Sequence, residues 1–203
     1  MIKNIVFDFG GVILIHSTTV CEEALAETFE VSLPEATELW RRYATPLFTG
    51  DEDSKQFLGR VKDATGSTTD LATLSEKWID GYVKRAQGVQ NDVLALVEEL
   101  TGSYGVYLLT NTIDVHDEYN AGRGLYDKFL QVYKSFEGGL RKPDERIYKK
   151  VFSEWDIKPE ESVFIDDMPE NVDGARRVGM AGILFTGNDL LKEALRELGV
   201  VVR

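Results

Sequence analysis

The chain has 203 residues, a hydrophobic fraction of 43% and a formal net charge of −12. This length suits one sizeable domain or a core domain with an insertion, and the apolar content excludes a wholly disordered chain. The negative charge argues against a surface that neutralises nucleic-acid phosphates, so we expect no nucleic-acid partner.

The cysteine content and the N-terminal segment bear on where the protein resides. The single cysteine, Cys21, cannot form an internal disulfide, and no Cys/His spacing is typical of a zinc site. The N-terminus lacks the features of a signal peptide, and no window holds the roughly twenty apolar residues that span a bilayer. We therefore expect a cytoplasmic protein with no membrane partner.

The first predicted strand lies in the apolar segment 5–13, which carries the carboxylate of Asp8 followed by Gly10 and Gly11. Buried strands are short apolar segments, and the ligands of open α/β sheets bind beyond the carboxyl ends of the strands. A carboxylate at such an end is a candidate site residue.

Residues 18–86 show apolar side chains at helical spacing, with no strand pattern among them. Ser32 and Glu35 form a capping-box pattern, residues 50–54 interrupt the spacing and cap the next helix, and Asp70 begins another. The pattern predicts a small module of four consecutive helices.

From residue 89 onward, predicted helices alternate with predicted strands. The expected elements are a helix at 93–100, a strand at 105–110, a strand at 129–136, a helix at 143–155 with Pro143 near its start, a strand at 162–165, a helix at 171–178, a strand at 181–185 and a helix at 190–198. Such alternation predicts a doubly wound, Rossmann-like α/β core with a parallel sheet. We assign residues 1–15 and 87–203 to this core, and residues 16–86 to a four-helix cap inserted after strand 1.

Polar side chains follow several of these strands or precede a helix. They are Asp8, Thr110 with Asn111, Lys142, and Asp166 with Asp167. Each one alone could be a helix cap, a dipole partner or a solvated charge. Because parallel strands place their carboxyl ends along one edge of a sheet, we expect the whole set to converge there.

Three convergent carboxylates repel one another unless a cation lies between them. Mg²⁺ prefers a few carboxylates together with waters and a phosphate group. A lysine and a hydroxyl can then hold the phosphate oxygens, so the set indicates phosphoryl transfer.

The order of these residues resembles the haloacid dehalogenase superfamily of hydrolases. The motifs that carry the resemblance are Asp8-Phe9-Gly10-Gly11-Val12, Leu109-Thr110-Asn111, Arg141-Lys142-Pro143 and Phe164-Ile165-Asp166-Asp167. Residues 50–53 and 139–148 are similar to the branch that contains bacterial sugar-1-phosphate phosphatases and the phosphatase domain of soluble epoxide hydrolase.

The resemblance implies a Mg²⁺-dependent phosphatase that acts on a small phosphorylated metabolite through an aspartyl-phosphate. It implies that Asp8 is the nucleophile and that Lys142 neutralises charge beside it. The implied phosphate-binding residues are Gly10, Gly11, Thr110 and Asn111. The implied metal ligands are Asp8, the backbone carbonyl of Gly10, Asp167 and, directly or through water, Asp166, with Asn171 supporting the aspartates.

Gly10 departs from the usual family pattern, which has a second aspartate there as general acid and base. A positioned acid contributes on the order of 10²–10⁴-fold. Three alternatives follow: a phosphatase for leaving groups that need little protonation, a 2-haloacid dehalogenase, or a phosphate-ligand-binding protein with weak or no turnover. We favour the phosphatase, because Asp166 and Asp167 beside Asp8 would be unfavourable in a metal-free dehalogenase.

Several other residues have two interpretations. His16 either faces the cleft as a proton donor or lies in a surface loop, which is the interpretation we favour; His116 either touches substrate or occupies an exposed helix position. Trp40, Phe48, Trp78 and Tyr82 either shape specificity or form the cap core, and core is favoured. Arg141 and Arg146 could capture anions, with Arg146 expected to be solvated.

Overall fold

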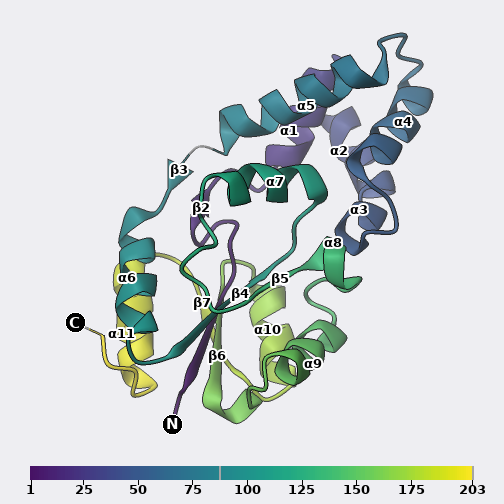
Figure 1. Cartoon of the computed structure of the whole chain (residues 1–203). Helices are drawn as coiled ribbons and strands as arrows, with labels where there is room; N and C mark the ends of the chain where they lie inside the picture. Colours follow the sequence, from purple (N-terminus) through teal and green to yellow (C-terminus); the bar gives the residue numbers. More distant parts are fainter. Residues whose placement is uncertain (87, 203) are drawn as a thin grey trace.

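The computed structural model describes residues 1–86 and 88–202, so residue 87, where we expected the core to resume, and residue 203 lie outside the described residues. A five-stranded sheet forms one half of the molecule (Figure 1), with strand order β5-β4-β1-β6-β7 and parallel pairing throughout. Its strands are β1 (Asn4–Phe7), β4 (Gly105–Thr110), β5 (Val132–Lys134), β6 (Ser162–Asp166) and β7 (Ala181–Leu184).

Helices cover both faces of this sheet. Helices α6 (Asn91–Thr101) and α11 (Asn188–Glu197) lie on one face, and α9 (Glu145–Glu154) and α10 (Pro169–Arg177) lie on the other. Successive residues of a strand point to opposite faces. Ile5 and Phe7 therefore pack with α6 and α11, whereas Val6 packs with α9 and α10. The predicted doubly wound α/β core is confirmed.

A second hydrophobic core holds together the helices between strands β2 and β3. These helices are α1 (Val20–Phe29), α2 (Leu33–Tyr43), α3 (Thr45–Thr49), α4 (Ser54–Thr65) and α5 (Leu71–Arg85). The predicted caps at Asp53 and Asp70 are present, since Asp53 forms a capping box with Gln56 and Asp70 accepts a hydrogen bond from the Thr73 amide. Of the capping box predicted at Ser32 and Glu35, the structure has the hydrogen bond from the Glu35 amide to the Ser32 side chain. The prediction of four helices missed α3, a short helix that Gly50 ends in a left-handed conformation.

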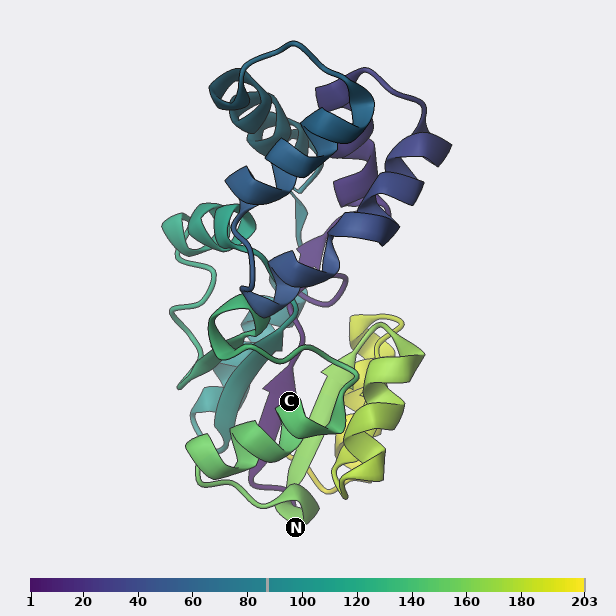
Figure 2. The same ribbon diagram turned by 90° about the vertical axis from the view of Figure 1, so that its right-hand side faces the viewer.

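A short antiparallel ribbon joins the two halves of the molecule. Strand β2 (Leu14–Ile15) pairs with β3 (Gly88–Val89), so the chain enters and leaves the helical unit side by side. Both views show this unit beyond the carboxyl ends of the parallel strands (Figures 1 and 2). The division into a core of residues 1–15 and 87–203 and a cap of residues 16–86 stays a prediction.

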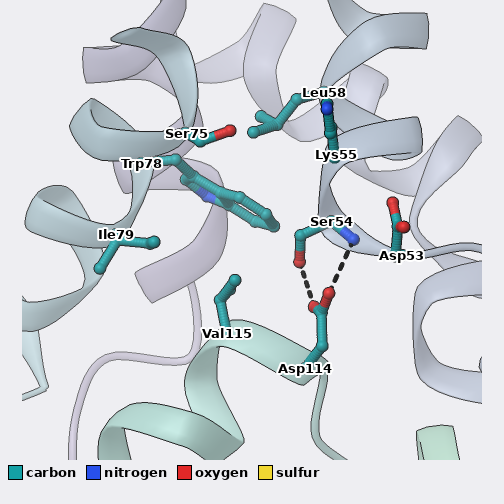
Figure 3. A pocket seen from close by; sticks show the side chains of 9 residues that line it. All are labelled: Asp53, Ser54, Lys55, Leu58, Ser75, Trp78, Ile79, Asp114 and Val115. Atoms are coloured by element: carbon teal, nitrogen blue, oxygen red, sulfur yellow. Dashed lines mark hydrogen bonds between the residues drawn. The ribbon is translucent and has the colours of Figure 1, made fainter. Parts of the chain in front are cut away.

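Helix α7 (Asp114–Gly122) carries a direct contact between the helical unit and the sheet domain. The Asp114 carboxylate accepts a hydrogen bond from the backbone amide of Ser54 at 3.0 Å and another from the Ser54 hydroxyl (Figure 3). Asp114 is the first residue of α7 and Ser54 the first of α4, so one carboxylate lies at the N-termini of two helices. A negative charge is favourable at both ends.

The first strand ends at Phe7, directly before Asp8, and the chain then turns at Gly11, which has a φ of 75°, as the sequence predicted. Two other predicted elements differ from the structure. The strand predicted at 129–136 covers only β5, since α8 (Ser135–Gly138) follows it. Helix α9 begins at Glu145 rather than at Pro143, because the Asp144 side chain caps it.

Within the part of the chain that the structure describes, no helix is long and apolar enough to cross a membrane. A cytoplasmic location stays a prediction.

Candidate active site

The carboxyl ends of three adjacent strands bring the first candidate residues together. Asp8 follows β1, Thr110 ends β4 and Asp166 ends β6, and all three side chains are buried. Strand β1 lies between β4 and β6 in the sheet. The predicted convergence at one sheet edge is therefore present in the structure.

Lys142 lies between two of the carboxylates. Its Nζ is 2.6 Å from Oδ1 of Asp8 and 2.7 Å from Oδ2 of Asp166, and its side chain is 1% exposed. Asn111 holds this lysine from the side: its Oδ1 accepts from the Lys142 amide at 2.9 Å, and its Nδ2 donates to the Lys142 carbonyl at 3.0 Å. The Asn111 side chain is thus bonded to the Lys142 backbone, whereas the sequence had suggested a phosphate contact.

Asp166 accepts hydrogen bonds on both carboxylate oxygens. Besides the Lys142 contact, Oδ1 accepts from the Met168 amide at 2.8 Å, and Asn171 Nδ2 lies 3.0 and 3.1 Å from the two oxygens. Asn171 supports this aspartate as the sequence analysis expected. The donors around Asp166 give it a structural role around Lys142 and leave its oxygens little freedom for other ligands.

Asp167 differs from its neighbour, because no hydrogen bond to its carboxylate is found among the described residues. The Asp167 carboxylate lies against the backbone of Gly11, where a Cβ atom would be only 2.1 Å from Oδ2 of Asp167. Glycine at position 11 therefore allows this carboxylate to lie in the site. The amide of Gly11 donates to the Leu14 carbonyl at 2.9 Å. Gly11 thus makes room for a carboxylate, and its amide is already used within the turn.

The three aspartates form a candidate metal centre. Asp8, Asp166 and Asp167 each offer one carboxylate oxygen, and these oxygens all lie within 4.8 Å of one another. Burial raises the pKa of Asp8 to about 7, with Lys142 lowering it and Asp166 raising it. Burial, and then the charge of Asp166, also raise the pKa of Asp167. A hard cation with a preference for oxygen ligands would offset this repulsion, so the residues fit Mg²⁺.

Lys142 stays protonated in this cluster. Burial lowers its pKa, but the charges of Asp166 and Asp8 outweigh burial, and the pKa is raised above its usual value. The site therefore holds one fixed ammonium group against three carboxyl groups. An ammonium group in this position can bind an oxygen of a phosphoryl group as well as the two carboxylates.

His16 occupies the space beside Gly10. A Cβ atom at position 10 would lie only 2.7 Å from Nε2 of His16. The other ring nitrogen, Nδ1, is 2.8 Å from the Ser17 carbonyl oxygen, and the half-buried imidazole lines the same cavity as Asp8. The surface-loop interpretation of His16 is wrong, because the turn after β1 folds the ring back against the strand end.

A cavity of about 240 Å³ extends from these charged groups to the helical unit. Asp8, Gly10, Thr110, Asn111 and Lys142 line its sheet end together with Asp167 and Asn171. Its other walls include apolar and aromatic side chains from both parts of the chain, namely Leu14, Val20, Trp40, Phe48 and Tyr82. The cavity therefore joins a charged end to a largely apolar end.

The remaining candidates fall into two groups. Trp40, Phe48 and Tyr82 line the active-site cavity, as does Arg141, whose guanidinium carbon lies 4.9 Å from the centre of the Phe48 ring. Trp78 packs in the core of the helical unit and lines a separate cavity of about 170 Å³ near Ser54 (Figure 3). Arg146 is paired with Asp144 and its side chain is 73% exposed, as expected for a solvated residue.

His116 and Asn120, both on α7, also line the active-site cavity. His116 is buried rather than exposed, so that alternative was wrong, and its ring stacks on Tyr82 with centroids 3.5 Å apart. Burial lowers the pKa of His116 to about 3. Asn120 was not among the residues predicted from the sequence. Its spacing of four from His116, in the helix that follows Thr110-Asn111, was the available signal.

A family model for haloacid dehalogenase-like hydrolases matches residues 2–179. The chain belongs to this family. It is 29% identical to D-ribitol-5-phosphate phosphatase from Bacteroides thetaiotaomicron, over 88% of this chain and 89% of that protein. It is 36% identical to the sesquiterpene phosphatase astK from Aspergillus oryzae, over 97% and 96% of the two chains. These relatives are phosphatases, which agrees with the predicted enzyme class.

A solved structure shows the same fold. It is a haloacid dehalogenase family enzyme from Bacteroides thetaiotaomicron in complex with magnesium and inorganic phosphate, with a TM-score of 0.79 and 24% identity. The match covers 93% of this chain and 97% of that chain. The family resemblance and the fold predicted from the sequence are confirmed.

Proposed function

We propose that this hydrolase is a Mg²⁺-dependent phosphatase that cleaves small phosphomonoesters through an aspartyl-phosphate. The observation that carries the proposal is the placement of Asp8 at the end of a central strand, with Lys142 bonded to one of its carboxylate oxygens. Oδ1 of Asp8 contacts Lys142, so Oδ2 is the oxygen with fewer partners for attack on phosphorus.

The reaction then follows in two steps. In the first, Asp8 Oδ2 forms a bond to phosphorus while the bond between phosphorus and the ester oxygen breaks, and water supplies the proton with which the alcohol leaves. In the second, water or hydroxide attacks phosphorus, the bond between phosphorus and Asp8 Oδ2 breaks, and Asp8 and inorganic phosphate are released. Lys142 and the Thr110 hydroxyl would hold phosphoryl oxygens in both steps, since Lys142 lines the cavity beside Asp8.

Asp8, Asp167 and the Gly10 carbonyl would hold the magnesium ion. Asp167 suits direct ligation because Gly11 leaves space for its carboxylate, whereas Lys142, Met168 and Asn171 already donate to Asp166. The ion, when bound, supplies positive charge against the phosphoryl oxygens and the carboxylates. Asp166 would act through Lys142 and through water.

The substrate we propose is a small phosphorylated metabolite. The names of the two relatives, a D-ribitol-5-phosphate phosphatase and a sesquiterpene phosphatase, support small phosphorylated substrates of differing polarity. Gly10 removes the carboxylate that usually protonates the leaving group, and His16 occupies that space. We also propose that residues 16–86 act as a cap, whose closure over the sheet edge excludes water.

A panel of phosphoesters tests the function directly. p-Nitrophenyl phosphate, sugar 1-phosphates and D-ribitol 5-phosphate are assayed for phosphate release, with Mg²⁺ and with chelator. We expect activity that needs Mg²⁺ and that Asp8→Asn abolishes, while Asp173→Asn, an exposed site on α10, serves as the matched control.

The other outcomes identify the alternatives. Activity retained in chelator or in Asp8→Asn would overturn the mechanism. Chloride release from 2-chloroacids without metal would indicate a dehalogenase. Phosphate binding without turnover of any ester would indicate a binding protein.

A further inference from the structure

The end of the active-site cavity that lies toward the helical unit is called the cap end below. Two residues that line this end each have a buried polar atom without a hydrogen-bond partner within residues 1–86 and 88–202. The atoms are Nε2 of His116 and Oδ1 of Asn120, and both residues line the cavity. Because they are four residues apart on α7, they lie on one face of the helix. An unpaired buried polar atom destabilises the protein, so each of these atoms favours a hydrogen-bond partner.

Tyr82 fixes the orientation of both side chains. Asn120 donates from Nδ2 to the Tyr82 hydroxyl at 3.0 Å, which leaves its carbonyl oxygen as the unpaired atom. The His116 ring lies parallel to the Tyr82 ring, with an interplanar angle of 9°. Tyr82 belongs to α5 and the other two residues to α7, so this group forms where the helical unit contacts the sheet domain.

The two unpaired atoms have complementary capacities. Oδ1 of Asn120 can only accept a hydrogen bond, whereas Nε2 of a neutral imidazole can donate or accept, depending on the tautomer. Burial keeps His116 neutral by lowering its pKa to about 3. A hydroxyl group donates one hydrogen bond and accepts others, so a single hydroxyl can satisfy both atoms.

The surroundings of these two atoms limit the rest of the ligand. Five of the residues that line the cavity are apolar or aromatic, namely Leu14, Val20, Trp40, Phe48 and Tyr82, and the polar side chains of Thr18, Glu22 and Arg141 line it as well. Apolar surface in the ligand would be removed from water along these walls.

We propose that His116 and Asn120 bind a hydroxyl group of the leaving alcohol, and that the substrate is a phosphomonoester with an apolar body and a hydroxyl group remote from the phosphate. The proposal rests on the proposed phosphatase function for the position of the phosphate. It makes His116 and Asn120 specificity residues, which contact the substrate away from the reacting atoms.

Matched pairs of esters test this proposal. Each pair is an ω-hydroxyalkyl phosphate and the n-alkyl phosphate in which a methyl group replaces the hydroxyl, in a series of increasing chain length. At one length we expect a kcat/KM preference for the hydroxyl ester of about 10- to 100-fold, which is equivalent to about 1.4–2.8 kcal/mol. His116→Phe, which keeps a ring on Tyr82, and Asn120→Leu should each reduce that preference at least several-fold. Glu118→Gln, an exposed site on the same helix, should keep it.

Binding of the corresponding phosphonates, measured by calorimetry on the unaltered protein, separates the two proposals. If the phosphonates show the hydroxyl preference but no ester is hydrolysed, the subsite stands and the proposed function fails. If the esters are hydrolysed without any hydroxyl preference, or with a preference that both variants retain, the subsite is overturned. A stronger preference for ω-aminoalkyl esters would also overturn it, because the subsite would then select an ammonium group.

Discussion

The two ends of the active-site cavity are built differently. At the sheet end, charged side chains occur together, and Lys142, Asp166, Asn171 and Asn111 are joined by ion pairs and hydrogen bonds. At the cap end, aromatic rings dominate, and His116 and Asn120 each keep a buried atom without a partner in the described part of the chain. The protein itself pairs Lys142 and Asp166 at the sheet end, whereas the cap end keeps two buried polar atoms unpaired among the described residues.

This difference assigns the chemical reaction to the sheet end and the choice of substrate to the cap end. The sheet end is fixed by strand ends that cannot move without disturbing the core, so it suits a reaction that requires exact placement of charge. The cap end is formed by α5 and α7, which belong to two parts of the chain that meet across the cavity. We expect substitutions at the sheet end to affect stability and turnover, and substitutions at the cap end to affect the choice of substrate.

The largest expected effect is loss of the lysine at the sheet end. Lys142→Met leaves Asp8 and Asp166 buried without their cation, and removal of one partner from a buried ion pair costs about 3–5 kcal/mol. Urea unfolding measures this loss. Lys128→Met is the matched control, because Lys128 pairs with Glu98 at 2.9 Å with side chains 43% and 68% exposed. Its loss should stay below about 1 kcal/mol, and equal losses for the two variants would contradict the ion pairing of Lys142.

Position 10 tests whether the missing carboxylate limits turnover. Gly10→Asp alone places its Cβ against Nε2 of His16, so the imidazole must move. The double variant Gly10→Asp with His16→Ala provides the space. For alkyl phosphates relative to p-nitrophenyl phosphate, we expect its kcat to rise by up to about 10²-fold, the low end for a positioned acid. An unchanged ratio in the double variant would show that protonation of the leaving group does not limit the rate.

The two adjacent aspartates should respond differently to removal of charge. Asp167→Asn should weaken the apparent Mg²⁺ affinity by about 10- to 100-fold, a range seen even for groups that only support metal ligands. Asp166→Asn should instead lower the unfolding free energy, because Lys142 loses one of its two carboxylates. Titration of activity with Mg²⁺ and urea unfolding distinguish these effects. If Asp166→Asn weakened the Mg²⁺ affinity and Asp167→Asn lowered the unfolding free energy, Asp166 would be the metal ligand.

The smallest effect concerns the pH dependence of stability at the cap end. The pKa of His116 is lowered from its ordinary value of 6.5 to about 3 in the folded protein. Between these values the unfolded chain binds a proton that the folded protein does not, so the unfolding free energy falls as pH falls below 6.5. One pH unit below 6.5 the loss is about 1.4 kcal/mol.

Urea unfolding at pH 7.5 and at pH 5.5, the second being about one unit below an ordinary histidine pKa, measures this loss. His116→Phe should lose less stability than the unaltered protein between the two values. The raised pKa of Asp8 makes the unfolding free energy rise as pH falls, which is opposite to the effect of His116. Asp8 is present in both proteins, so its contribution cancels when their stability losses are compared. Identical losses in the two proteins would mean that His116 can take up a proton without unfolding.

The sequence by itself determined the fold class and most of the charged end of the site. Strand residues such as Val6 and Leu109 are apolar because both faces of a parallel sheet are buried, and Asp8, Thr110 and Asp166 stand where those apolar segments stop. Parallel pairing alone then brings these groups together. The helices of the cap were predicted from spacing and caps at Asp53 and Asp70, which are local signals.

The tertiary structure alone decided which atoms remain available in the site. Asn111 bonds to the Lys142 backbone, and Gly11 makes room for Asp167, because segments far apart in the chain come into contact. His16 fills the space beside Gly10 because of the course of the turn after β1. A contact between distant segments also buries His116, since α5 places Tyr82 over it. Periodicity reports which face of an element is apolar, but not which neighbouring element will cover a polar side chain.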